Sequence, residues 1–142
     1  MRNFPLKGLS LTSRYALQGM AYLARQPEGK FCLVEEVASQ QKLPANFLSK
    51  IFQRLARREL LAPRRGPGGG YALAKAAHKI SMAEVVSAME ELPPEGNQCF
   101  LAFRGCGAAR HCAIHDAAAQ ANDILWQALR RTSLLHLERR DR

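Results

Sequence analysis

The sequence predicts a mainly α-helical protein with one small β-hairpin, and three observations support this fold class. Apolar residues recur at spacings of three and four in residues 11–58 and again after residue 112, as in amphipathic helices. Two short apolar segments flank the sequence RRGPGGG at residues 64–70, as expected for a hairpin with a glycine-rich turn. The 142 residues suffice for one domain with its own core and an appended element.

Three helices are expected before the hairpin. The first covers residues 11–25 and ends at Pro27-Glu28-Gly29. The second covers residues 34–41, with Val34, Val37 and Ala38 facing inward. The third begins near Pro44, which suits a first helical turn, and runs to about residue 58. Its apolar residues predict one buried face: Phe47, Leu48, Ile51, Phe52 and Leu55.

The second and third helices have the pattern of a helix-turn-helix, since both are short, a tight turn joins them and the latter is basic. The polar positions of the third helix can donate to phosphates or base edges: Asn46, Ser49, Lys50, Gln53, Arg54 and Arg57. A solvated helix face is the alternative interpretation of these six residues alone.

Residues 60–63 and 71–73 predict the two strands of the hairpin, which would form a wing with Arg64 and Arg65 at its tip. Arginine at such a tip can enter a narrow minor groove. A nucleotide-phosphate loop is disfavoured, because GPGGGY lacks the Lys-Ser/Thr ending of a P-loop and the spacing of a dinucleotide fingerprint.

Ser81 and Glu84 form a Ser-x-x-Glu capping box that opens a helix to about Met89. After a loop at about residues 92–112, a helical pattern runs from residue 112 or 113 to Leu137. So long an apolar stripe predicts pairing with a second copy, and packing on residues 11–25 is the alternative. We therefore expect a DNA-binding domain in residues 1–80, and this loop with a dimerisation helix in residues 81–142.

The charge is unevenly distributed. Residues 1–80 carry 14 Lys and Arg against 4 Asp and Glu, whereas residues 81–142 carry 7 against 8. A basic first half indicates a polyanionic partner, most simply nucleic acid, although a generally basic surface would look the same. No apolar run approaches the roughly 18 residues that span a membrane, and the first residues do not resemble a signal peptide, so a cytoplasmic protein is expected.

Three of the four cysteines and a histidine lie within seventeen residues: Cys99, Cys106, Cys112 and His115. Thiolates and imidazole are ligands of both zinc and iron–sulfur clusters. Cys112 and His115 would share one face of a first helical turn. Four uses stay open at this point: an iron–sulfur cluster, structural Cys3His zinc, a metal-free thiol switch, and a Cys112–His115 nucleophile–base pair. Cys32, far from this set, is expected in the core.

The chain resembles the winged-helix iron–sulfur regulators of the IscR/NsrR/RirA type over about residues 9–137. The resemblance rests on Arg14-Tyr15-Ala16, LSKIFQRL at residues 48–55, RGPGGGY at residues 65–71, EVVSA at residues 84–88 and the cysteine–histidine set. It implies a homodimer on a roughly palindromic double-stranded DNA operator, with the third helix in the major groove and the wing in the minor groove. Some IscR proteins carry a glutamate at the position of Ser49, so the operator sequence of those proteins is not expected to apply to this chain.

The resemblance also implies that Cys99, Cys106, Cys112 and His115 hold an iron–sulfur cluster. [2Fe-2S] is preferred, because Arg14 stands where [4Fe-4S] relatives place an acid. [4Fe-4S] remains an alternative, because the gap between Cys99 and Cys106 has six residues where IscR typically has five.

We therefore predict a DNA-binding transcription regulator, in the first instance a repressor, that senses iron–sulfur status, redox state or nitric oxide. We expect it to be no enzyme, to take no small-molecule substrate and to lie away from membranes. The predicted DNA-binding residues are Asn46, Ser49, Lys50, Arg54, Arg64 and Arg65. A zinc-stabilised or thiol-switched regulator is the alternative, and a small thiol or metal enzyme is a remote one.

Overall fold

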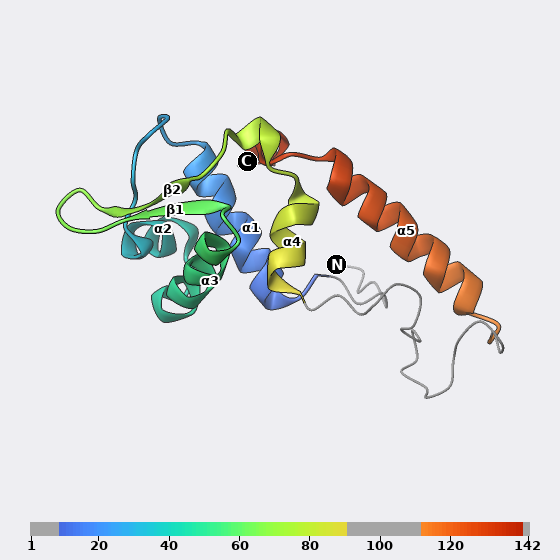
Figure 1. Ribbon diagram of the computed structural model, residues 1–142. Coiled ribbons are helices and arrows are strands. Elements are labelled where there is room, and N and C mark those ends of the chain that lie inside the picture. Colours follow the sequence, from blue (N-terminus) through green and yellow to red (C-terminus); the bar gives the residue numbers. More distant parts are fainter. Residues whose placement is uncertain (1–8, 91–111, 141–142) are drawn as a thin grey trace.

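The computed structural model describes residues 9–90 and 112–140 and confirms a mainly helical fold with one two-stranded antiparallel sheet. Four helices form a compact group with the hairpin protruding on one side and the last long helix extending on the other (Figure 1). In chain order the elements are α1 (Leu11–Ala24), α2 (Val34–Gln41), α3 (Ala45–Arg57), β1 (Leu61–Arg64), β2 (Gly70–Leu73), the 3-10 helix η1 (Ala77–Lys79), α4 (Met82–Met89), α5 (His115–Arg131) and the 3-10 helix η2 (Leu134–Arg140).

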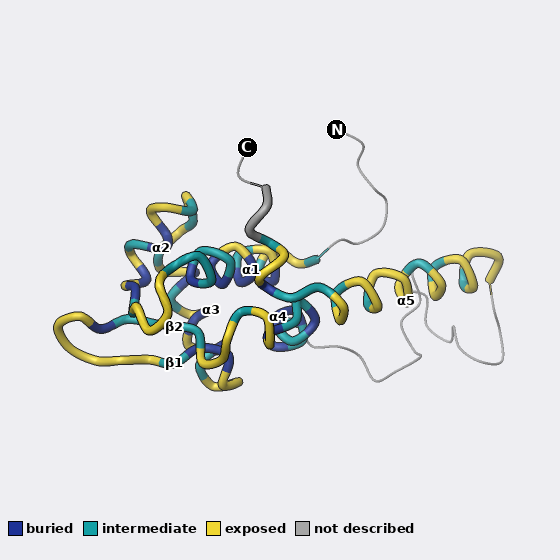
Figure 2. The backbone as a smooth tube through the Cα atoms, turned by 90° about the horizontal axis from the view of Figure 1, so that it is seen from above, coloured by how far each residue is buried: buried dark blue, intermediate teal, exposed yellow. Residues whose placement is uncertain are grey.

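The core lies between α1, α2, α3 and α4, which all turn apolar faces inward (Figure 2). The α3 helix buries Leu48, Ile51, Phe52 and Leu55, each at most 2% exposed. Phe47 was predicted to join them but is 49% exposed and makes an edge-on contact with Tyr15. Its ring lies at the margin of the buried stripe, so helical periodicity alone overstated its burial.

The wing is attached to the helical group through the chain segment before α2. Leu61 pairs with Leu73 and Arg64 with Gly70, which gives the predicted hairpin. Cys32 adds an isolated bridge to Tyr71, in which each backbone N–H donates to the other residue's carbonyl (2.9 and 2.8 Å). Cys32 therefore holds the hairpin near its turn, since Tyr71 pairs with Pro63, next to the last pair Arg64–Gly70.

The predicted capping box at α4 is formed. Ser81 Oγ accepts from the Glu84 N–H at 3.1 Å, and the Glu84 carboxylate accepts from the Ser81 N–H at 2.9 Å. Burial raises the pKa of the Glu84 carboxyl, but hydrogen bonds from Ser81 and the cation of Lys75 outweigh burial, so the pKa lies below its ordinary value. These bonds fix the start of α4 as the sequence predicted.

The last helix is shorter than predicted. The expected helix to Leu137 ends at Arg131, and the chain then turns back so that Leu134 is fully buried in the core. Thr132 leaves the helical conformation, its carbonyl accepts from the Met82 N–H at 2.8 Å, and the Leu134 N–H donates to the Ile80 carbonyl at 2.9 Å. Burial of Leu134 and these bonds favour the turn over further helix. The core therefore draws residues from both sides of the predicted domain boundary at residue 80.

Candidate nucleic-acid interface and cysteine site

The face of α3 opposite the core is polar and accessible. Asn46, Lys50, Gln53 and Arg57 are exposed, and Ser49 is half-buried. They share this face because the buried residues of α3 take the other half of its circumference. The structure thus brings Asn46, Ser49 and Lys50 together on one accessible surface of the second helix of the helix-turn-helix.

Arg54 differs from its neighbours on this face because it already has partners. Its Nη2 donates to the carbonyl oxygens of Ala88 at 3.2 Å and Met89 at 3.0 Å, at the end of α4. Arg54 was predicted to bind DNA because its position on α3 is polar. That assignment stays a prediction, and the structure gives Arg54 an intramolecular contact that the sequence pattern does not indicate.

The wing presents two exposed arginines. Arg64 ends β1 and its guanidinium carbon lies 5.0 Å from the centre of the Phe31 ring, a cation–π distance. Arg65 follows at the start of the turn, which is closed by the Gly69 N–H donating to the Gly66 carbonyl at 2.9 Å. Phe31 therefore lies against one of the two arginines, a contact that the sequence pattern did not indicate.

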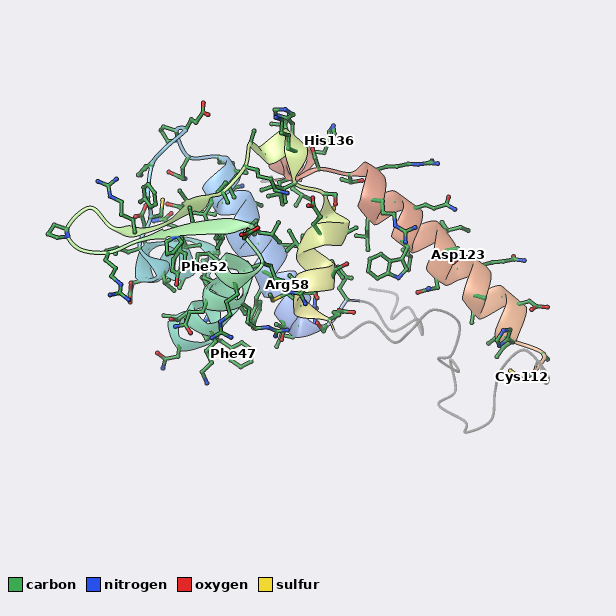
Figure 3. The ribbon with its side chains drawn as sticks, in the orientation of Figure 1. Phe47, Phe52, Arg58, Cys112, Asp123 and His136 are labelled. Carbon is green, nitrogen blue, oxygen red and sulfur yellow. The ribbon has the colours of Figure 1, made fainter. Side chains whose placement is uncertain are left out.

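Only part of the cysteine set lies within the described residues. Cys112 is exposed and His115 is half-buried at the first residue of α5, far from the helical group (Figure 3). Cys112 was expected on the first helical turn, but it precedes the helix, and its carbonyl accepts from the His115 N–H at 3.0 Å. This turn places Cys112 directly before α5, whose first residue is His115. Cys99 and Cys106 lie outside the described residues.

The donors present fit a soft metal or iron–sulfur group as far as they are described. Across residues 9–90 and 112–140, no three His, Cys, Asp or Glu side chains converge as a metal site. The described part contributes one accessible thiol and one imidazole, which are ligand types of zinc and of iron–sulfur clusters. A complete site on this side of the molecule would need Cys99 and Cys106 as well.

Cys32 belongs to the core, as predicted. Its side chain is fully buried. Burial raises the pKa of its thiol, the carboxylate of Glu36 raises it further, and Lys30 opposes them. A thiol held protonated in the core is a poor nucleophile and a poor ligand. Cys32 is therefore separate from the cysteine set of residues 99–115.

The sequence and the fold match known regulators. Residues 9–140 match the Rrf2 family, described as "Iron-dependent Transcriptional regulator". The HTH-type transcriptional regulator IscR of Cronobacter sakazakii is 32% identical over 117 residues, which cover 82% of this chain and 71% of that protein. IscR of Pectobacterium carotovorum is 29% identical over 126 residues, covering 89% and 76%.

Solved structures share the fold at low identity. T. potens IscR superposes with a TM-score of 0.74 at 18% identity, covering 92% of this chain and 85% of that one. CymR of B. subtilis, titled the global cysteine regulator, gives 0.76 at 20% identity and 97% coverage of both chains. The oxidized form of Staphylococcus aureus CymR gives 0.73 at 22%, covering 93% and 96%. None of the described helices is long and apolar enough to cross a membrane. The chain belongs to the Rrf2 family and is a DNA-binding transcriptional regulator of the IscR-like kind.

Proposed function

We propose that this chain is a homodimeric repressor whose operator affinity is set by an iron–sulfur cluster. The observation that carries the DNA-binding part is the accessible polar face of α3 beside a wing with two exposed arginines. In this proposal Asn46, Ser49 and Lys50 contact bases or phosphates in the major groove, and Arg64 and Arg65 contact the minor groove. Arg54 is not included in this contact set because its guanidinium already donates to α4.

Replacing Lys50 by glutamine is expected to weaken binding to an operator selected from a random duplex library by about tenfold, because one cationic contact is lost. The slope of log affinity against log salt should fall by about one. Lys79→Gln is the matched control: it removes the same charge from exposed η1, away from α3. Fluorescence anisotropy measures the affinity of both variants. Equal losses in the two would show that net charge alone causes the effect.

We infer that the dimer forms along α5. No residue of this helix is buried in the single chain, although Trp126 and Leu129 pack against the core beside α4. A second apolar stripe beside them faces outward and includes Ile124 at 68% and Leu125 at 50% exposed. The described part of the chain does not cover these apolar residues, and such an exposed stripe favours pairing with a second copy. In this proposal, the DNA-binding unit is residues 1–80 and the sensing and dimerisation unit is residues 81–142.

The cofactor part of the proposal assigns Cys99, Cys106, Cys112 and His115 as ligands of an iron–sulfur cluster, [2Fe-2S] before [4Fe-4S]. Support comes from the donor types and from the family's description as iron-dependent. When bound, a cluster supplies a redox-active centre whose potential depends on its ligands and surroundings. His115 as a ligand would add sensitivity to protonation. The turn between Cys112 and His115 holds these two donors at the start of α5, so a change in their binding acts directly on the proposed dimer helix.

Protein purified without oxygen is expected to be coloured, with iron–sulfur bands in its visible absorption spectrum that disappear in Cys106→Ala. A colourless protein with one zinc per chain would contradict the cluster and support the structural-zinc alternative.

A thiol switch is the second candidate function. The exposed thiol of Cys112 favours it, and the fold is shared with a CymR structure described as oxidized. It predicts colourless protein in which operator affinity changes on oxidation and recovers with a thiol reductant.

A further inference from the structure

The end of α4 is held from two sides. On one side, Arg54 of the recognition helix α3 donates to the carbonyls of Ala88 and Met89 at 3.2 and 3.0 Å. On the other side, Glu90 Oε1 accepts from the Ser10 N–H at 2.9 Å and from the Ser13 hydroxyl at 3.0 Å, at the start of α1. We call these contacts the α4 bracket.

Both groups of contacts in the α4 bracket provide partners for polar groups that helix ends leave without intrahelical hydrogen bonds. The last carbonyls of a helix lack intrahelical donors, and a cation opposes the negative end of the helix dipole. The first N–H groups of α1 lack intrahelical acceptors, and a carboxylate there is favoured for the same reason. Ser13, which donates to Glu90, is fully buried, and Ala88 and Met89 are at most 7% exposed. Arg54 and Ser10 are exposed and Glu90 is half-buried, so the bracket joins α1, α3 and α4 at the margin of the core.

We propose that Arg54 is a positioning residue: it fixes the tilt of α3 on the end of α4 through the bracket, and does not bind a DNA phosphate. The inference rests on the proposed DNA-binding function of α3. It also has a consequence for regulation, because Glu90 directly precedes the part of the sequence that carries Cys99 and Cys106. A displacement at residue 90 would reach the recognition helix through Arg54.

The test compares Arg54→Gln with Lys50→Gln in the full chain. Lys50 is exposed one turn earlier on the same helix, belongs to the proposed contact set and serves as the control. The first measurement is the salt dependence of binding to a 30-base-pair duplex of arbitrary sequence. Lys50→Gln should lower the slope by about one, as a lost phosphate contact does, whereas Arg54→Gln should lower affinity by about tenfold at every salt concentration with the slope unchanged.

The second measurement is backbone hydrogen exchange. The Glu90 N–H donates to the Val86 carbonyl at 2.8 Å, so its exchange reports the last turn of α4. Arg54→Gln should speed this exchange by about tenfold and leave the amides of α2 unchanged, because charge-assisted hydrogen bonds are the stronger kind. A slope that falls by about one in Arg54→Gln, or unchanged exchange at Glu90, would overturn the positioning role.

Glu90→Ala gives an independent check, because the α4 bracket and simple electrostatics predict opposite changes in DNA affinity. Removing a negative charge from a DNA-binding protein should raise its affinity for DNA. The bracket predicts the reverse, a loss of affinity together with faster exchange at the end of α4, and a gain of affinity would overturn it. Wild-type protein that binds no duplex would refute the proposed function, while the exchange data would still decide whether Arg54 holds α4.

Discussion

Replacing Gly70 by alanine should lower the free energy of unfolding by about 3 kcal/mol, because two costs add at one position. Gly70 has φ +125°, a conformation that residues with a side chain rarely adopt. An added Cβ would also overlap the carbonyl group of Cys32, which pairs with Tyr71. The backbone would have to move, and the hydrogen bonds that fix the wing to the helical group would be lost. Urea unfolding followed by circular dichroism measures the change.

Gly68→Ala is the control for this effect. Gly68 also has a positive φ of +71°, but no atom lies within 4 Å of an added Cβ. Only the backbone strain remains, so the expected loss is about 1 kcal/mol. Equal losses in the two variants would show that the close approach of Gly70 to Cys32 does not stabilise the wing.

Replacing Ile124 by glutamate should convert the protein to monomers and lower operator affinity by about 100-fold or more, since two linked half-sites bind far more tightly than one. Ile124 is 68% exposed in the single chain, on the stripe that we assign to the second copy. A carboxylate at position 124 of one subunit would lie near the same carboxylate of the other subunit across a two-fold interface, and like charges repel. Sedimentation equilibrium gives the mass and anisotropy gives the affinity.

Asn122→Asp adds the same charge to an exposed position two residues before Ile124, on the other side of α5, and should leave both mass and affinity near wild type. A dimeric Ile124→Glu protein would contradict the assignment of the interface to this stripe.

The first three helices, the hairpin and α4 could be predicted from the sequence because their signals are local. The α2 boundaries Val34–Gln41 follow from apolar spacing, and α4 begins where the Ser81–Glu84 capping box predicts. The polar face of α3 could be predicted in the same way, since the buried positions of one amphipathic helix determine the exposed ones.

The features that sequence reasoning missed depend on contacts between distant residues. The turn after Arg131 arises because Leu134 enters the core and bonds to Ile80, and the helical spacing continued through it. Arg54 looked like any other cation on α3, and only the packing of α4 shows its carbonyl partners 34 and 35 residues away. Phe31 contacts Arg64 at the turn end of β1, a pairing that no local pattern encodes.

We propose that the cysteine set controls DNA binding. The most direct test is the operator affinity of oxygen-free protein, measured by anisotropy before and after iron removal, in wild type and in Cys106→Ala. We expect wild-type affinity to change by about tenfold or more, within the usual range of coupling between two sites, and Cys106→Ala to show one affinity in both states. Cys32→Ala, which removes the buried thiol of the core, should keep the wild-type response. An iron-dependent affinity that persists in Cys106→Ala would contradict control of DNA binding by the cysteine set.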